Sequence, residues 1–496
     1  MSTQTVTSSD APQTKRGGVG RWVKRILIAL VALVVVLLAV VIGGLLYFHI
    51  PTNSAGLAAQ SVCSATFVAG RGQDQDVFKQ DVVPQSPVFA LVSTSIDQAG
   101  RTVTAKFLGL FERRASLLPN RGCVLDEAPD PAAVPFTPAP ANPAPWPIGD
   151  ASVPQEQWGQ GVNAAGLQSV VDRAFVGAGD PAAANARGVA VVYKGRLLAE
   201  RQAQNFPAGT ALLGWSSTKT VAAMLFYKRA TETGFNIAQP VVDAFPPGRE
   251  PGWVAQWRQD DRKKITVADL LFMRAGLDIA DDYGPFAKVV QMLYGEPSMA
   301  GFAASQPLKD PPGSVWAYST GEADILAQVA QGMFATNEEY WQYPKKALFE
   351  PIGATSATLA TDTFGTWVGG SYLWADTGDW ARLGQVMLAD GKWAGKQVIP
   401  PGWWKLAGTP AMPSGDGHGY GAQTWIPGQP VGGTCNAYPG VPQDTLSMEG
   451  HYGQFVAMIP SRDVVIVRLG WTIDKTQFNS CQLTSDVLAN LPPAAR

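Results

Sequence analysis

The sequence predicts an α+β fold in which an antiparallel β-sheet is flanked by helices and carries a helical subdomain. Two hairpin patterns, at 189–200 and 454–469, each place apolar runs on both sides of a short turn. Apolar residues with helical spacing lie just before the first hairpin, at 166–175, and between the two hairpins. Strands at both ends with helices between them favour one sheet covered on its faces. A single transmembrane helix and a small β-rich module are predicted to precede this domain.

Length and charge limit the class of protein. The chain has 496 residues, 46% of them hydrophobic, and a net charge of -2, which indicates more than one ordinary domain and a large core. The near-neutral charge and the lack of a basic stripe exclude nucleic acid as a partner. The histidines His49, His418 and His451 stand in no metal-binding spacing, so we expect neither a metal nor a cofactor.

The N-terminus has the pattern of a membrane anchor. A polar and then basic tail, 1–25, precedes an uncharged run at 26–48, which is long enough for the ~30 Å hydrocarbon core of a bilayer. Because the positive charges precede the run, we expect a cytoplasmic N-terminus and a single-pass protein of the cell (inner) membrane, with the rest periplasmic or extracellular. A cleaved signal peptide is the alternative, since small residues at 55–59 leave a cleavage site open.

Two segments separate the anchor from the main domain. Residues 58–127 contain strand-like runs at 65–69, 88–92 and 102–108, which predict a small β-rich extracytoplasmic module without a catalytic constellation. Residues 128–154 are rich in proline and are predicted to form a stiff linker. The main domain is then 155–496.

The four cysteines fall into two regions. Cys63 and Cys123 lie near the start, and Cys435 and Cys481 lie near the end. Four cysteines allow three pairings. In an exported chain we favour pairing within each region, and free buried thiols are the alternative.

A Ser-x-x-Lys spacing stands at the start of a predicted helix. The largely apolar run 221–230 follows Ser216 and Ser217, which are candidate N-cap residues. Lys219 comes one turn after Ser216, so its amine can reach the Ser216 hydroxyl. Burial and the helix N-terminus both lower a lysine pKa, which lets the amine accept the serine proton. The alternative is a capping serine and a solvated lysine.

Two other stretches offer partners for this serine. Tyr318 follows a Pro-Pro-Gly turn at 311–313, and a lysine ammonium beside its phenol would lower the phenol pKa and make it a relay base. The alternative for Tyr318 is a buried aromatic residue. His451, Gly453 and Gln454 lead into the last hairpin, where glycine allows substrate to approach and an edge-strand amide can complete an oxyanion hole.

In this order, the three motifs resemble those of the serine β-lactamase and penicillin-binding-protein superfamily. Within it the chain is most similar to class C β-lactamase-related serine hydrolases of the 6-aminohexanoate-dimer hydrolase and esterase type. Supporting stretches lie at 214–216, 265–271, 275–278, 312–313 and 380–385, and the resemblance covers roughly residues 160–490. It implies a β-lactamase/transpeptidase-like fold and an acyl-enzyme mechanism.

The resemblance also implies a role for each matched residue. Ser216 would be the acylated nucleophile, Lys219 its activating partner and Tyr318 the general base or acid. The backbone amides of Ser216 and Gln454 would form the oxyanion hole. His451 occupies the third motif, where lysine is common in true β-lactamases.

Two departures from the family pattern affect the expected substrate. The Tyr-x-Asn motif reads Tyr318-Ser319-Thr320, which removes the amide that would hold the lysine. His451 in place of lysine is mostly uncharged at neutral pH. We therefore expect an amidase or esterase that acts on a small-molecule or peptide-like acyl substrate, and the oligomeric state stays open.

Two other functions compete with this interpretation. An α/β-hydrolase would use Ser319 in 317–321, a loose Gly-x-Ser-x-Gly elbow, but the prolines at 311–312 leave little room for the strand that an elbow needs. A penicillin-binding-like sensor or ligand-binding domain without catalysis is the other alternative, and Thr320 is the reason to consider it.

Overall fold

The computed structural model describes residues 19–71, 76–138, 142–284, 286–412, 419–430 and 432–493. The chain divides into two compact units, Met1–Pro51 and Thr52–Arg496. The first unit contains helix α1 (Val19–Tyr47), of which Trp22–Tyr47 is long and apolar enough to cross a bilayer. The helix predicted at 26–48 is therefore present. Its length and composition are also those of a signal sequence.

The second unit is built on a five-stranded antiparallel sheet, in the order β12-β13-β14-β5-β6. Its strands are β5 (Ala186–Tyr193), β6 (Arg196–Gln202), β12 (Leu446–Gly450), β13 (Gln454–Ile459) and β14 (Val464–Gly470). Both predicted hairpins are confirmed. The turn between β5 and β6 has positive φ at Lys194 and Gly195, as in the two-residue turns that match strand twist.

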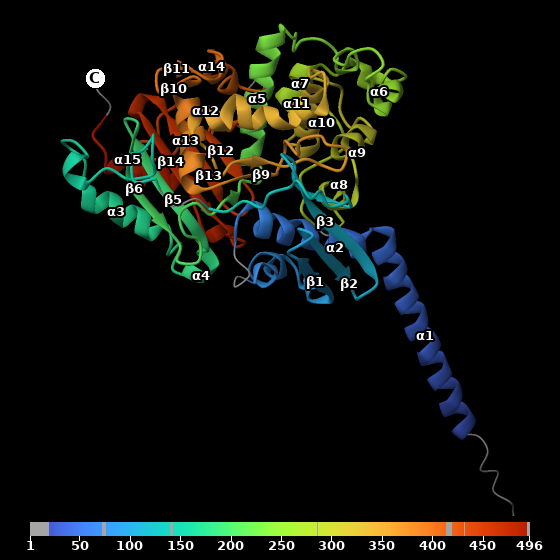
Figure 1. Ribbon diagram of the computed structural model, residues 1–496. Coiled ribbons are helices and arrows are strands. Elements are labelled where there is room, and N and C mark those ends of the chain that lie inside the picture. The colour runs from blue at the N-terminus through green and yellow to red at the C-terminus, as the bar shows by residue number, and fades with distance from the viewer. Residues whose placement is uncertain are drawn as a thin grey trace, which may run out of the picture. The chain divides into compact units, whose positions relative to one another are not determined.

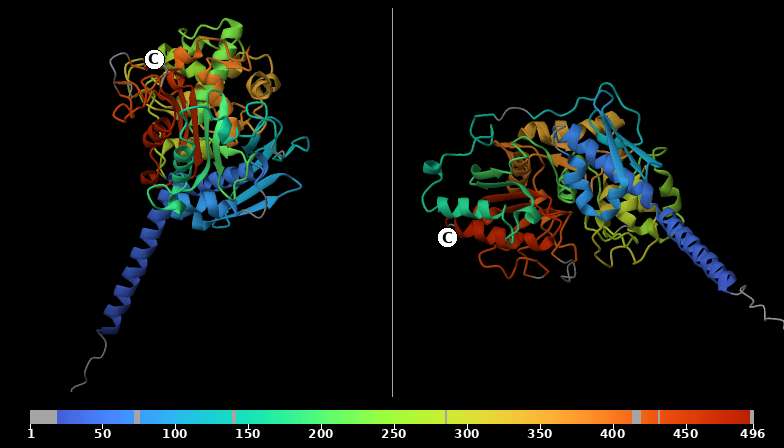
Figure 2. Two further views of the ribbon diagram at one scale, coloured as in Figure 1. Left: turned by 90° about the vertical axis from the view of Figure 1, so that its left-hand side faces the viewer. Right: turned by 90° about the horizontal axis from the view of Figure 1, so that it is seen from below.

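Helices cover both faces of this sheet (Figure 1). Val189 and Val191 of β5 pack with α3 (Ala164–Arg173) and α15 (Ser480–Ala489), which lie side by side (Figure 2). Ala190 and Val192 join the larger cluster with α5 (Ser217–Thr233) and α13 (Thr377–Leu388). Successive strand side chains point to opposite faces. The completely buried strand β5 therefore packs against a helical layer on each face of the sheet. The predicted α+β class is confirmed.

A helical subdomain lies between β6 and β12, as predicted, and α10 is its most buried helix. Its helices are α6 (Gly252–Trp257), α7 (Val267–Leu271), α8 (Lys288–Gly295), α9 (Met299–Ser305), α10 (Thr320–Gly332), α11 (Asn337–Pro344), α12 (Glu350–Ile352) and α14 (Trp403–Ala407). A small sheet in the order β7-β9-β8 joins it to α5. The remaining short elements are α4 (Pro181–Ala184), β7 (Leu212–Leu213), β8 (Thr358–Leu359), β9 (Leu373–Ala375), β10 (Lys392–Trp393) and β11 (Lys396–Gln397).

The N-terminal module contains a helix and a four-stranded antiparallel meander. These elements are α2 (Ile50–Cys63), β1 (Val92–Asp97), β2 (Thr102–Phe107), β3 (Phe111–Leu118) and β4 (Gly122–Leu125). A disulfide from Cys63 to Cys123 joins α2 to β4, and a second one joins Cys435 to Cys481. Pairing within each region is therefore confirmed.

Two of the strands predicted in this module are wrong. Residues 65–69 lie largely in a π-helical turn, Ser64–Val68, and residues 88–92 lie largely in a 3₁₀ turn, Pro87–Leu91. Short apolar runs fit a buried helical turn as well as a strand, and Pro87 at the first helical position favours the turn. The small residues at 55–59 lie in α2, where Ala55, Ala58 and Ala59 are fully buried, so packing explains their size.

The N-terminal module shares its core with the main domain. Side chains of β2 and β3 belong to the same hydrophobic cluster as α5 and α13. The buried Asp81 carboxylate pairs with both Arg71 and Arg187 of β5. Trp471 Nε1 donates to the Asp81 carbonyl at 3.1 Å. The module boundaries stay a prediction, and these contacts join the two segments in one unit.

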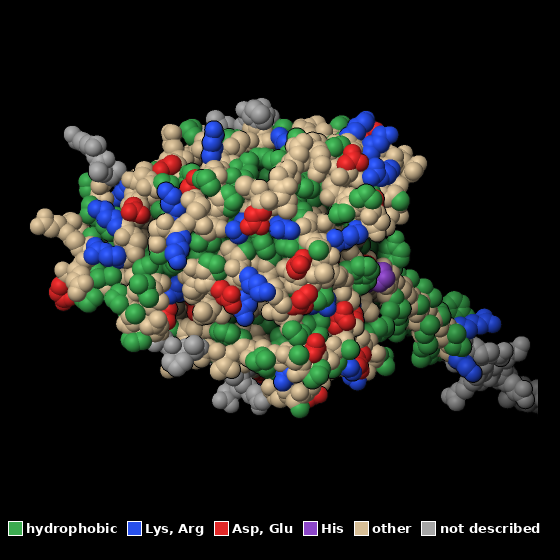
Figure 3. Space-filling model, turned by 45° about the horizontal axis from the view of Figure 1, so that its top comes forward, with side chains coloured by type: hydrophobic (Ala, Val, Ile, Leu, Met, Phe, Trp, Pro, Cys, Tyr) green, Lys and Arg blue, Asp and Glu red, His purple; other side chains and the backbone are tan. Residues whose placement is uncertain are grey.

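The proline-rich segment is partly packed. Trp146 is 3% exposed and lies edge-on to Trp393. Arg382 of α13 donates to Asp150 at 2.9 Å. The end of the predicted linker is thus attached to the main domain. On the face in Figure 3, basic and acidic side chains are interspersed.

Candidate active site

Ser216 lies in a tight turn between β7 and α5. The Gly214 N–H donates to the Leu373 carbonyl of β9 at 2.8 Å, and a Cβ on Gly214 would come within 2.2 Å of the Trp380 ring. Trp215 has φ +46°, a left-handed conformation that non-glycine residues adopt at sites under constraint. Ser216 occupies the N-cap position but makes no side-chain cap, so its hydroxyl is available to Lys219.

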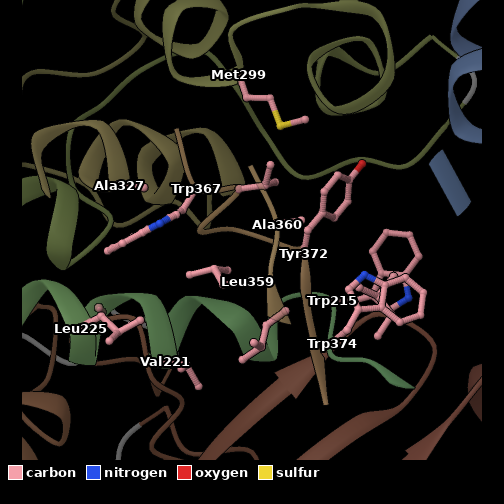
Figure 4. Packing of buried hydrophobic residues seen from close by; sticks show 14 of the residues in the cluster. Trp215, Val221, Leu225, Met299, Ala327, Leu359, Ala360, Trp367, Tyr372 and Trp374 are labelled. Carbon is pink, nitrogen blue, oxygen red and sulfur yellow. The ribbon is translucent and has the colours of Figure 1, made fainter. Parts of the chain in front are cut away.

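Lys219 brings its amine to that hydroxyl. The side chain is 1% exposed, because α5 starts inside the core, where Val221 and Leu225 pack (Figure 4). Lys219 Nζ lies 2.9 Å from Ser216 Oγ, 2.8 Å from Thr320 Oγ1 and 3.0 Å from the Gly370 carbonyl. Burial lowers the Lys219 pKa, as predicted, and the charge of Asp281 opposes that shift.

Thr320 takes over the contact that the missing asparagine would make. Its hydroxyl lies 2.5 Å from Asp281 Oδ2, and its N–H donates to Asp281 Oδ1 at 2.7 Å. A carboxylate only accepts, so the Thr320 hydroxyl donates to Asp281 and accepts from Lys219. Asp281 Oδ2 is itself 3.8 Å from Lys219 Nζ. The lysine is therefore held without the amide.

These contacts are compatible with proton transfer from Ser216 to Lys219. A neutral lysine amine has two N–H groups and one lone pair. Thr320 Oγ1 and the Gly370 carbonyl accept the two N–H groups. In a neutral amine the lone pair would then be directed at Ser216 Oγ, whereas an ammonium donates to it. The geometry suits a neutral amine that accepts the serine proton.

Tyr318 lies on the other side of Ser216. Its hydroxyl hydrogen-bonds to Ser216, and its ring stacks on Trp425 with centroids 5.5 Å apart. Burial raises the Tyr318 pKa well above its usual value, so the predicted lowering is wrong. Lys219 Nζ lies 4.7 Å from the ring centroid, over the ring face, but loss of solvent is the largest cause of the Tyr318 shift, and the charge of Asp281 adds to it. Tyr318 keeps its proton and acts as a donor.

The third motif lies at the edge of the main sheet. Main-chain bonds of 2.9 and 3.0 Å join Ser447 of β12 to Trp425 on the outer side of the strand. Because main-chain groups alternate along a strand, Glu449 presents its own on the same outer side, and His451 is the first residue after β12. A Cβ on Gly450 would lie 2.1 Å from the Gly214 carbonyl. The end of β12 therefore adjoins the Ser216 turn.

Gln454 has a different position from His451. It lies on β13 opposite Gly450, and the same alternation assigns its N–H to the pairing with β12. Its side chain bonds both main-chain groups of Gly470, at 2.6 and 3.0 Å. Gly453 has φ +81°, which the tight turn from β12 to β13 requires.

His451 packs beside the nucleophile. Its ring stacks on Tyr283 with centroids 4.4 Å apart and meets the edge of Trp215 at 5.5 Å. Burial, with a contribution from Lys475, lowers the His451 pKa to about 4. The imidazole is neutral at neutral pH, in agreement with the sequence analysis.

Comparison with known proteins identifies the family. The Beta-lactamase family model matches residues 171–470, which include Ser216, Lys219, Tyr318 and His451. The chain belongs to the beta-lactamase family. A search of curated proteins gave no match.

Solved structures are also similar to this chain, and the first of the three below supports the fold. A family VIII carboxylesterase is 13% identical with a TM-score of 0.51, covering 69% of this chain and 98% of its own. A Bacillus anthracis protein assigned as a 6-aminohexanoate-dimer hydrolase is 20% identical with a TM-score of 0.49, covering 62% of this chain and 81% of its own. A penicillin-binding protein homologue from Caulobacter crescentus is 15% identical (TM-score 0.47; 69% and 99% covered).

The beta-lactamase-family fold excludes the α/β-hydrolase alternative. Ser319 is 1% exposed and caps α10, where its hydroxyl accepts from the Glu322 N–H at 3.3 Å. No strand precedes it between 311 and 319, although a nucleophile elbow follows a strand. Ser319 is thus a capping residue of this beta-lactamase-family chain.

Sequence reasoning missed Asp281 and Asp324, two carboxyls near Lys219. Asp324 is 1% exposed and accepts from the Gly370 N–H at 2.9 Å, and burial raises its pKa to about 8. An acidic loop at 278–282 was the available signal for Asp281. No cluster of metal-binding side chains occurs among the described residues. His418, the third histidine, lies outside them.

Proposed function

We propose that this chain is a serine hydrolase that cleaves an ester or amide through an acyl-enzyme on Ser216. The observation that supports this proposal most directly is the position of the buried Lys219 amine. It lies 2.9 Å from Ser216 Oγ and has two oxygen acceptors for its own protons. That arrangement supplies a nucleophile and its base. Membership of the beta-lactamase family supports the same reaction.

In the acylation step, Ser216 Oγ attacks the carbonyl carbon of the substrate and its proton passes to Lys219. The product is a tetrahedral oxyanion beside a lysine ammonium. The charge of Asp281 favours the ammonium form, so it stabilises this state. The ammonium then returns the proton through the Tyr318 hydroxyl to the leaving alcohol or amine, and an acyl ester remains on Ser216.

We assign the oxyanion hole to the main-chain N–H groups of Ser216 and His451, in place of the expected pair of Ser216 and Gln454. In the described part of the chain, neither of the two assigned N–H groups donates a hydrogen bond. The assignment is supported by the position of His451 directly after Gly450, whose Cβ would lie 2.1 Å from the Gly214 carbonyl. Two such donors stabilise the oxyanion in acyl transfer. Water then attacks the acyl ester in a second cycle and releases a carboxylic acid.

Labelling tests this function directly. A fluorophosphonate probe and a p-nitrophenyl ester are applied to the full chain and to Ser216→Ala. We expect labelling and a burst of p-nitrophenol in the wild type and neither in the variant. Ser319→Ala is the matched control, and it should label like the wild type. Equal labelling of wild type and Ser216→Ala would refute the assignment.

A ligand-binding protein without turnover is the second candidate. The reason to consider this candidate is that the chain lacks the asparagine amide of the Tyr-x-Asn motif. The Thr320 hydroxyl and Asp281 hold the lysine instead, which supports the enzyme. A wild-type chain that binds a substrate analogue yet forms no Ser216 adduct would favour the ligand-binding protein.

We propose that the enzyme is anchored by α1, with the catalytic unit outside the cytoplasm. The apolar helix and the basic residues before it support this orientation, and two disulfides suit an oxidising compartment. Protease added to cells that have lost their outer layers but keep an intact inner membrane should digest the catalytic unit. If the catalytic unit is digested only after that membrane is lysed, the proposed orientation is wrong.

A further inference from the structure

Three exposed leucines lie together at one end of the N-terminal module. Leu91, Leu108 and Leu110 are 46%, 59% and 78% exposed, and the two hydrophobic clusters of the described residues include none of them. Leu108 and Leu110 belong to the turn between β2 and β3, and the Leu108 N–H donates to the Leu91 carbonyl at 2.8 Å. We call these three residues the leucine tip.

The turn that carries the leucine tip has an unusual sequence for its backbone. Leu108 has φ +50° and Gly109 has φ +71°, and the Leu110 N–H donates to the Phe107 carbonyl at 3.0 Å. Hairpin turns of this kind favour Asn-Gly or Gly-Gly, because a leucine has a steric cost in the left-handed region. Packing in a hydrophobic cluster does not account for Leu108. A residue that breaks a local rule without such a contact points to a role outside the fold.

Helix α2 and strand β3 run in the same direction through the module. The Tyr294 carbonyl accepts from Arg113 Nη1 of β3 at 2.9 Å, and a Cβ on Gly56 of α2 would lie 2.2 Å from the same oxygen. Further along both elements, the first disulfide joins the end of α2 to β4, at a residue that pairs with Leu117 of β3. The starts of α2 and β3 therefore lie at the same end of the module.

The chain enters the second unit at that end. Thr52 precedes Gly56 by about 6 Å of helix, and Leu110 precedes Arg113 by about 10 Å of strand. The start of the second unit and the leucine tip are thus at one end of the module. Thr52 comes five residues after Tyr47, the last residue of α1, and five residues span at most about 18 Å.

We propose that the leucine tip enters the surface of the bilayer that holds α1, and so orients the catalytic unit on the membrane. The inference rests on the proposed anchoring by α1. If α1 spans the bilayer, the short connection keeps the end of the module that carries the tip close to the lipid. Transfer of leucine from water to hydrocarbon is favourable. Lys106 and Glu112 on the flanking strands pair at 2.9 Å, so the contact is apolar and needs no anionic lipid.

Spin labels in the full chain test this contact. All four cysteines form disulfides, so Leu110→Cys supplies the only free thiol for an apolar nitroxide label. In phosphatidylcholine vesicles, we expect that label to collide more with oxygen, which concentrates in lipid, than with a water-soluble nickel chelate. Ile96→Cys is the matched control, because Ile96 is 42% exposed and lies near the far end of β1. A label there should collide more with the nickel chelate.

Leu108→Asn tests the turn leucine in the chain labelled at 110. Asparagine favours positive φ, so the thermal unfolding temperature should stay the same or rise. A leucine that enters lipid favours the docked state roughly tenfold, so the ratio of docked to undocked label should fall by about that factor. A lower unfolding temperature with unchanged label accessibility would show that Leu108 only packs within the fold, and it would overturn the proposal.

A label in α1 separates this proposal from the anchoring. Leu37→Cys should give the oxygen-dominated pattern of lipid. If it does and the label at 110 behaves like the one at 96, the lipid contact is overturned and the anchoring stands. A label at 110 that is shielded from both reagents, with spin–spin coupling that unlabelled chain dilutes away, would mean that a second copy covers the tip, and it also overturns the proposal. A nickel-dominated pattern at both 37 and 110 overturns both.

Discussion

Replacing Thr320 by valine tests how the lysine is held. Valine has nearly the shape of threonine, so the first turn of α10 should persist, but the hydroxyl is lost. Lys219 then keeps two of its three oxygen contacts, and Asp281 Oδ2 loses a donor that lies 2.5 Å away. The amine loses its defined orientation toward Ser216.

The expected magnitude follows from that one group. A hydrogen bond to a charged partner contributes about 1.5–3 kcal/mol, and each 1.4 kcal/mol changes a rate about tenfold. Thr320→Val should therefore slow acylation roughly 10- to 150-fold. Because the hydroxyl acts through the lysine and touches no substrate, KM should change less than kcat.

Stopped-flow measurement of the p-nitrophenol burst gives the acylation rate, and thermal unfolding gives the stability of each variant. Thr320→Ser keeps the hydroxyl and is the matched control, with an expected burst within a few-fold of wild type. A Thr320→Val burst equal to that of the wild type would refute the role of this hydroxyl.

Three further predictions concern charge and covalent links. Asp281→Asn removes a charge that raises the Lys219 pKa, so the acidic limb of the pH profile of kcat/KM should move to lower pH; an unmoved limb contradicts this. Asp324 has a folded pKa of about 8, so it binds more protons folded than unfolded, and stability falls as pH rises from about 4 to 8. Urea unfolding of Asp324→Asn should lack that part of the slope, and parallel curves would contradict it. Replacing both Cys63 and Cys123 by alanine should lower the free energy of unfolding by about 2–5 kcal/mol in the same assay, and an unchanged value would show that the link is dispensable.

The main sheet could be predicted because its signals are local. Both hairpins combine strand-like runs with a short turn, and the turn at Lys194 and Gly195 has the positive φ values that such sequences favour. The 216–219 spacing is likewise local, since one helical turn brings the lysine to the serine. Short apolar runs such as 65–69 do not carry enough pattern to separate strand from helix.

The rest of the site depends on contacts between distant segments. Asp281 lies near Lys219 only in the folded chain, and no sequence spacing between the two residues predicts their contact. Register bears on the proposed oxyanion hole, because Ser447 pairs with Trp425 on the outer side of β12 and Gln454 pairs with Gly450 from the next strand. A one-residue difference in register reverses such an assignment, and the sequence does not specify the register of this strand.

The ion pairs of Asp81 bear on how this enzyme can be produced. A chain shortened to begin at residue 155 would lack the Asp81 carboxylate that pairs with Arg187 and would expose apolar surface that packs against the N-terminal module, which costs roughly 25 cal/mol per Å². We therefore expect such a fragment to aggregate on expression, whereas one that starts at α2 should be soluble. The segment before the catalytic domain is then part of its folding unit.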